Sequence, residues 1–175
     1  MKLIKTPRII AALQFAGFHF KLINHRRKYT GVPYIQHPIN VAILVQSVGG
    51  DENQVIAAIN HDTVEDCPFV TIEMIEQQFG TDVAGLVSDL TDVSKPQDGN
   101  RATRKQIDLE HTAKASPRAK TIKLADLIDN TKDIVANDRV FAKTYLAEKK
   151  RLLEVLKDGN PTLYQIALNQ ISVDI

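Results

Sequence analysis

The amino-acid sequence predicts an all-α fold, a single compact bundle of about eight or nine helices. Apolar residues recur every three or four positions in most segments, as on the buried face of an amphipathic helix. No segment shows the polar–apolar alternation of a half-buried strand. A capping residue followed by proline, which favours a helix start, occurs at Thr6–Pro7, Ser116–Pro117 and Asn160–Pro161. Helices joined by short connections indicate a helical globule.

Nine segments carry this helical pattern. In the N-terminal half they lie at about residues 7–23, 38–48, 55–61, 71–78 and 81–90. In the C-terminal half they lie at about residues 101–114, 117–135, 141–156 and 161–171. The third segment has few charges around it, so we expect it to be central and buried. Residues 94–100 contain Lys-Pro and Asp-Gly-Asn and form the most loop-like stretch.

Size and composition are those of an ordinary globular domain. The chain has 175 residues and is predicted to form one domain over residues 1–175. Its formal net charge of +1 argues against a dedicated nucleic-acid-binding protein. A single cysteine, Cys67, excludes an internal disulfide, and no apolar run is long enough to span a membrane. We therefore expect a cytoplasmic protein with neither a membrane nor a nucleic-acid partner.

The end of the third helix carries four groups that can bind a metal or a proton. They are His61, Asp62, Glu65 and Asp66. Residues four apart share a helix face, so each of the first two lies beside an acid if the turn continues. Imidazole and carboxylate together suit a borderline divalent ion such as Mn²⁺, Fe²⁺ or Zn²⁺. The alternative is a helix end with solvated acids before a proline.

A second acidic position lies inside an apolar run. Asp126 has two apolar residues on each side. Burying its carboxylate costs on the order of a few kcal/mol unless the group is paired or ligates a metal. Lys123, about one turn back, offers an ion pair as the alternative explanation. Asn130 lies one turn further on, on the same face.

Two imidazoles and two carboxylates from three separate helices can form a site for one ion. His37 stands directly before a proline that can open a helix, and His61, Asp62 and Asp126 follow in the chain. An octahedral ion held by these four side chains keeps positions for water or substrate oxygens. Residues 24–33 form a basic, turn-rich loop that is either a solvated connection or an anion contact, because arginine binds phosphate and stacks on bases.

These motifs resemble those of the HD-domain metal-dependent phosphohydrolases. Within that superfamily the chain is similar to the small alarmone hydrolases, the stand-alone relatives of the hydrolase half of the RelA/SpoT proteins (the metazoan SpoT homologue type). The matching residues are R-R-K at 26–28, G-V-P-Y-I-Q-H-P at 31–38, H-D-T-V-E-D at 61–66, Ser116–Pro117, Lys120, and K-L-A-D at 123–126 with Asn130. The resemblance covers about residues 8–157, which would be the core of an HD hydrolase domain.

The resemblance implies a role for each matching position. The ligands of one Mn²⁺ ion would be His37, His61, Asp62 and Asp126. Glu65 and Asp66 would position and activate the attacking water. The substrate contacts would be Arg27, Lys28 and Asn130, with Arg101 and Tyr145 as further candidates.

The implied reaction is hydrolysis of the 3′-pyrophosphate of guanosine tetra- or pentaphosphate, giving GDP or GTP and pyrophosphate. We expect hydrolysis only, because the family's synthetase domain would need further chain. Two positions depart from the family, which usually has a basic residue directly after the motif aspartate and an aromatic residue or histidine before the asparagine. Here they hold Leu127 and Asp129. We expect this change to remove positive and add negative charge on the substrate side.

Two other functions stay open at this point. One is an HD phosphohydrolase that acts on a different nucleotide, for example on a 2′- or 3′-phosphate of a dinucleotide cofactor. The other is a nucleotide-binding module without activity. The intact pair Glu65 and Asp66 argues against it, because a protein that only binds a nucleotide does not need acids that activate water.

Overall fold

The structure, a computed structural model, describes residues 2–172 and confirms the all-α fold. These residues contain ten α-helices and one short 3₁₀ helix, and no strand beyond an isolated bridge between Arg26 and Pro33. The first helices are α1 (Pro7–Leu22), α2 (Gln36–Ser47), α3 (Glu52–Asn60), α4 (Thr63–Asp66), α5 (Ile72–Phe79) and α6 (Thr81–Leu90). The others are η1 (Pro96–Asp98), α7 (Arg101–Ala113), α8 (Pro117–Asn137), α9 (Arg139–Val155) and α10 (Pro161–Ile171).

The helix starts follow the capping residues that the sequence predicts. Thr6 and Ser116 each accept a hydrogen bond from the backbone N–H three residues on, and Asn160 accepts one from each of the backbone N–H groups two and three residues on. The acidic stretch after α3 forms α4, a separate helix of four residues. Gly80 joins α5 to α6 with a φ of 93°, a conformation that side-chain-bearing residues rarely adopt.

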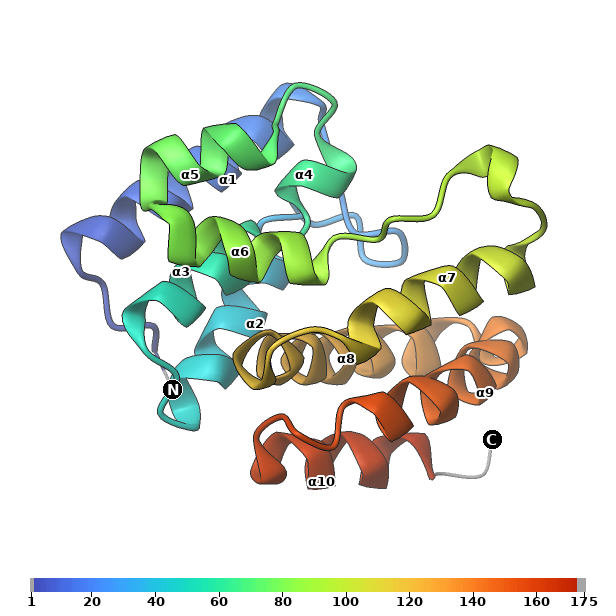
Figure 1. The fold of residues 1–175 in the computed structure, drawn as a ribbon. Coiled ribbons are helices and arrows are strands. Elements are labelled where there is room, and N and C mark those ends of the chain that lie inside the picture. Colours follow the sequence, from blue (N-terminus) through green and yellow to red (C-terminus); the bar gives the residue numbers. More distant parts are fainter. Residues whose placement is uncertain (1, 173–175) are drawn as a thin grey trace.

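Helices α3 and α8 form the centre of the molecule. Every residue of α3 from Gln54 to Asn60 is buried, as the low charge of this segment predicts. Helix α8 packs against α2, α3, α6, α9 and α10. The blue and green helices α1, α5 and α6 lie on one side of it, and α9 and α10 lie on the other (Figure 1). The site residues therefore sit on well-packed helices.

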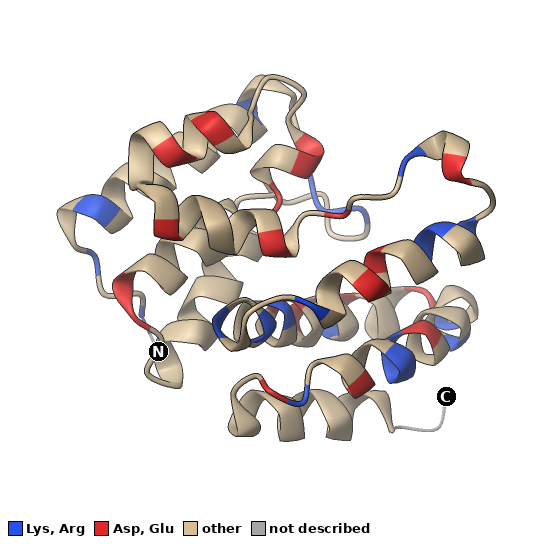
Figure 2. Cartoon of the chain, in the orientation of Figure 1, with Lys and Arg blue, Asp and Glu red and all other residues tan. Residues whose placement is uncertain are grey.

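Charged residues are spread over most helices. The charged residues of α3, α4, α5 and α6 are all acidic, whereas α7, α8 and α9 carry residues of both signs (Figure 2). None of the helices in residues 2–172 combines the length and the hydropathy needed to cross a bilayer.

Candidate metal centre

The two histidines and two aspartates singled out in the sequence meet at one point. His37 comes from α2, His61 and Asp62 from the junction of α3 and α4, and Asp126 from α8. The Nε2 atoms of His37 and His61 lie 3.2 and 3.8 Å from Asp126 Oδ1. The same two atoms lie 3.6 and 3.0 Å from Asp62 Oδ2. The structure thus brings together four side chains that span 90 positions of the sequence, from 37 to 126.

Each imidazole is held in the orientation that a metal ligand needs. The Nδ1 atom of His61 donates a hydrogen bond to the carbonyl oxygen of Ala58 over 2.8 Å. The Nδ1 atom of His37 donates to Asp129 Oδ2 over 2.6 Å. With the proton on Nδ1, the lone pair of each Nε2 atom is free to bind a cation.

The arrangement fits a divalent cation. Both Nε2 atoms are buried and form no hydrogen bond, which is costly for polar atoms unless a ligand pairs with them. One donor atom each from His37, His61 and Asp126 lies within 4.8 Å of the other two. Asp62 Oδ2 adds a fourth donor and is fixed by a hydrogen bond of 2.7 Å from the hydroxyl of Tyr34. Two nitrogen and two oxygen donors suit a first-row divalent metal.

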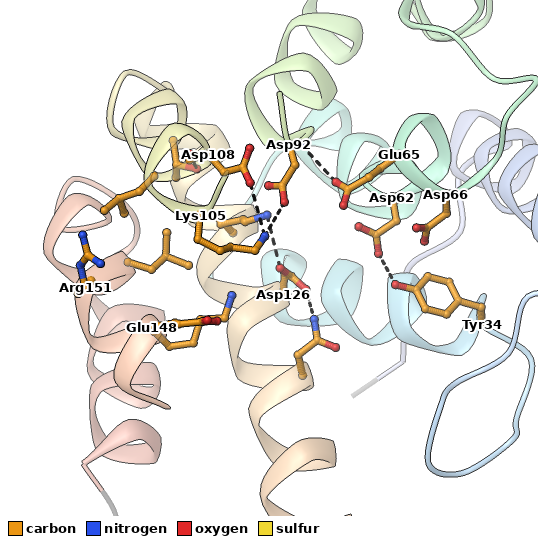
Figure 3. A pocket seen from close by; sticks show the side chains of 16 residues that line it. Tyr34, Asp62, Glu65, Asp66, Asp92, Lys105, Asp108, Asp126, Glu148 and Arg151 are labelled. Atoms are coloured by element: carbon orange, nitrogen blue, oxygen red, sulfur yellow. Dashed lines mark hydrogen bonds and ion pairs between the residues drawn. The ribbon is translucent and has the colours of Figure 1, made fainter. Parts of the chain in front are cut away.

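A cavity of about 250 Å³ opens beside this centre. Glu65 and Asp66, both on α4, line it together with Asp62 and Asp126 (Figure 3). Burial raises the pKa of Asp66 to about 7, and the charges of Asp62 and Glu65 act in the same direction. Burial and the charge of Asp92 also raise the pKa of Glu65. Acids with raised pKa values are suited to accept a proton near neutral pH.

The opposite wall of the cavity carries three lysines, of which the sequence motifs include only Lys123. Lys105 from α7 pairs with Asp92 over 2.8 Å, and Lys123 from α8 lies 3.9 Å from Asp126. Lys149 from α9 lies above the ring of Tyr145, at 5.1 Å from its centroid. Within residues 2–172, Lys149 has no carboxylate oxygen closer than 4.0 Å. The cavity thus offers positive charge opposite the acid pair.

The substrate contacts predicted from the sequence fall into two groups. Asn130 lines the cavity and donates a hydrogen bond of 2.5 Å to Asp126 Oδ1. Arg27 lines a neighbouring cavity of about 340 Å³ on the other side of His37, and its guanidinium donates to Asn130 Oδ1 over 2.8 Å.

The remaining three predicted contacts do not line the cavity beside the metal centre. The side chain of Lys28 is 74% exposed, and its ammonium lies 3.8 Å from Asp138. Arg101 lines an adjoining cavity and forms a two-point ion pair with Glu148. Tyr145 is buried under Lys149. Their contact with substrate stays a prediction.

The two positions that depart from the family have different surroundings from those expected. Leu127 is 2% exposed and packs in the core. Asp129 does not line the cavity that holds Glu65 and Asp66; its carboxylate faces His37 and Asn40. Asp129 lines the neighbouring cavity together with Arg27, so the expected effect of its negative charge on the substrate stays a prediction.

Thermal stability of the metal-free protein is expected to fall as the pH rises from about 5 to about 8. The pKa of Asp66, about 7, lies above the ordinary aspartate value, so the folded state keeps a proton that the unfolded state loses. Burial lowers the pKa of His37 and His61, but nearby carboxylates raise both above 6.5. Protonation of these imidazoles therefore stabilises the folded state fully below pH 6.5, and this stabilisation is lost as the pH rises through their raised pKa values.

Mn²⁺ binding requires ionised carboxylates and neutral imidazoles, so its stabilising effect grows over the same pH range. The difference in Tm between Mn²⁺-loaded and EDTA-treated protein should therefore be larger near pH 8 than near pH 6. Calorimetry at both pH values tests this, and an equal difference would contradict the expected linkage.

Comparisons with known proteins agree with this geometry. The model of the HD domain family matches residues 12–152. The guanosine-3′,5′-bis(diphosphate) 3′-pyrophosphohydrolase MESH1 of Drosophila melanogaster is 33% identical, over 95% of this chain and 93% of its own. The human MESH1 protein is 38% identical, over 74% of this chain and 71% of its own.

A solved structure is similar over the whole fold. It is described as a metazoan ortholog of SpoT that hydrolyses ppGpp and plays a role in starvation responses. It superposes with a TM-score of 0.84 at 32% identity and covers 95% of both chains. The chain therefore belongs to the HD domain family, in the same group as the MESH1 proteins.

Proposed function

We propose that this protein is a hydrolase that removes the 3′-diphosphate of guanosine 3′,5′-bis(diphosphate), and of its 5′-triphosphate form, in a reaction that depends on one Mn²⁺ ion. The products are GDP or GTP and pyrophosphate. The observation that carries the proposal is the pair of buried, unbonded imidazole Nε2 atoms facing two carboxylates beside a cavity with an acid pair. Relatives over nearly the full chain bear the name of this activity.

The metal supplies one part of the chemistry. When bound by His37, His61, Asp62 and Asp126, a divalent cation polarises a phosphoryl oxygen and lowers the pKa of a water. Its identity as Mn²⁺ is part of the proposal.

Glu65 and Asp66 supply the base. Their carboxylates face the cavity and have raised pKa values, so they can take the proton of the attacking water. The water oxygen forms a bond to the phosphorus next to the ribose, the bond from that phosphorus to the ribose 3′-oxygen breaks, and this oxygen takes up a proton. A general base of this kind typically contributes about 10²- to 10⁴-fold to the rate.

The lysines of the opposite wall bind the phosphates. Two of them already pair with carboxylates, so Lys149 has the most to gain from an anion. Burial lowers the pKa of Lys149 to about 8, and the charge of Lys123 contributes to this. A phosphate beside the ammonium would reverse that shift and gain binding energy.

Replacement of Lys149 by glutamine is expected to raise KM for the nucleotide about tenfold, with a smaller change in kcat. Lys150→Gln removes the same charge from an exposed neighbour and serves as the matched control. Steady-state kinetics of the two variants test this, and an unchanged KM in Lys149→Gln would contradict the assigned contact.

We further propose that residues 1–175 form a single hydrolase domain with a core at about residues 8–157, and that the protein works in the cytoplasm on a small nucleotide. The proposed metal ligands and the acid pair come from α2, from α4 with the junction before it, and from α8, all inside that core. The free thiol of Cys67 is in keeping with a reducing compartment.

The direct test is turnover of a nucleotide panel by the purified protein, stripped of metal and then supplied with Mn²⁺. We expect equal amounts of GDP and pyrophosphate from guanosine 3′,5′-bis(diphosphate), separated by ion-exchange chromatography, and no product with EDTA. Turnover of a different nucleotide alone, or binding without turnover, would contradict the proposal.

A further inference from the structure

Asp129 lies directly behind His37, on the side away from the cavity. Its Oδ2 atom accepts the hydrogen bond of 2.6 Å from His37 Nδ1, and its Oδ1 atom accepts one of 3.0 Å from Asn40 Nδ2. The side chain of His37 is fully buried, and that of Asp129 is 16% exposed. We propose that Asp129 is a positioning residue that fixes the protonation pattern of His37 and strengthens it as a metal ligand. This inference rests on the proposed metal centre.

The carboxylate sets the tautomer of His37 because it can only accept a hydrogen bond. The proton of the neutral imidazole must then sit on Nδ1, and the lone pair on Nε2 points toward Asp62 and Asp126. His61 reaches the same tautomer through the neutral carbonyl of Ala58. A charged acceptor raises the basicity of the imidazole more than a carbonyl does, so His37 is the stronger of the two nitrogen ligands.

Neighbouring side chains hold Asp129 in place. Asn40, on α2 one turn after His37, binds its second oxygen. Arg27 lies 3.9 Å from Asp129 Oδ2 and also pairs with Asp133 over 2.9 Å. Arg27 also donates to Asn130, which in turn donates to Asp126. Arg27 therefore contacts both Asp129, the partner of His37, and Asn130, the partner of Asp126.

Asp133 provides a matched control. It lies one turn after Asp129 on α8, shares Arg27 as partner, and its side chain is 15% exposed, against 16% for Asp129. It makes no contact with either histidine among the interactions of residues 2–172. Asp129→Asn and Asp133→Asn therefore remove the same charge from the same network, and only the first changes the partner of His37.

The first measurement uses the metal-free protein and needs no activity. Long-range ¹H–¹⁵N NMR, at a pH where both imidazoles are neutral, should show His37 of the unsubstituted protein and of Asp133→Asn with its proton on Nδ1. In Asp129→Asn the amide can donate as well as accept, so the Nε2-protonated form should appear. The Asp129→Ala variant has no side-chain acceptor for His37 Nδ1, so it should also show the Nε2-protonated form. An unchanged His37 tautomer in both Asp129 variants would overturn the proposal.

The second measurement is Mn²⁺ affinity by titration calorimetry. Loss of a partner behind a histidine ligand typically weakens metal binding about 10- to 100-fold, and we expect this for Asp129→Asn. Asp133→Asn should bind within about twofold of the unsubstituted protein. Equal affinities in the two variants would overturn the role of Asp129 but not the proposed metal centre. An unsubstituted protein that binds no Mn²⁺ would overturn both the role of Asp129 and the metal centre. Thermal unfolding of each variant verifies that it is folded.

Discussion

The Asp62→Ala variant is expected to bind no Mn²⁺ and to show no measurable turnover. Asp62 Oδ2 is one of four proposed donor atoms and lies 3.0 Å from His61 Nε2 and 3.6 Å from His37 Nε2. Without it, three ligands remain and the hydroxyl of Tyr34 loses its acceptor. A bound cation supplies several kcal/mol of transition-state stabilisation, so its loss should lower kcat/KM at least about a thousandfold.

Metal content by mass spectrometry and the rate of pyrophosphate release measure this effect. Asp133→Ala is the control for metal content, because Asp133 is similarly buried but pairs with Arg27 away from the imidazoles. Stoichiometric Mn²⁺ in Asp62→Ala would remove Asp62 from the ligand set.

The Glu65→Gln variant is expected to keep its metal and lose its rate. Glutamine has nearly the shape of glutamate and can still accept the hydrogen bond of 3.3 Å from the backbone N–H of Asp92. It cannot take a proton from water, so kcat should fall about 10²- to 10⁴-fold. Mn²⁺ affinity should change little, because Glu65 is not one of the four side chains that converge at the centre.

Single-turnover kinetics with saturating Mn²⁺ separate this effect from substrate binding. Glu110→Gln, which neutralises an exposed acid on α7, should behave like the unsubstituted protein. If Glu65→Gln instead lost its Mn²⁺, Glu65 would be a metal ligand and not the base.

Much of the fold could be predicted because its signals are local. The capping residues Thr6, Ser116 and Asn160 mark helix starts that the structure confirms. The exception is α4, since a helix of four residues leaves no apolar period to detect. The third helix ends at Asn60, directly before the polar cluster in which its end is predicted.

The proposed ligands could be identified because imidazole and carboxylate side chains stand in distinctive motifs. Their distances could not be predicted, because the packing of α2, α3 and α8 sets them. Lys105 and Lys149, from α7 and α9, belong to none of the quoted motifs, so only the folded structure places them at the same cavity as Lys123.

The direction in which the Asp129 side chain points could not be predicted from residue spacing alone. Residues three apart on a helix differ by about 60° in direction, and residues four apart by about 40° to the other side. Asp129 and Asn130 therefore diverge from Asp126, one toward His37 and the other into the cavity. The sequence places both near the centre, but the position of α2 decides which one lies behind the histidine.

The central claim is that one divalent cation sits among four side chains from three parts of the chain. An anomalous difference map from crystals grown with Mn²⁺, recorded on both sides of the manganese absorption edge, tests it most directly. We predict one strong peak within bonding distance of the Nε2 atoms of His37 and His61 and of a carboxylate oxygen of Asp62 and of Asp126. A peak bound elsewhere, or none at this position, would contradict the account.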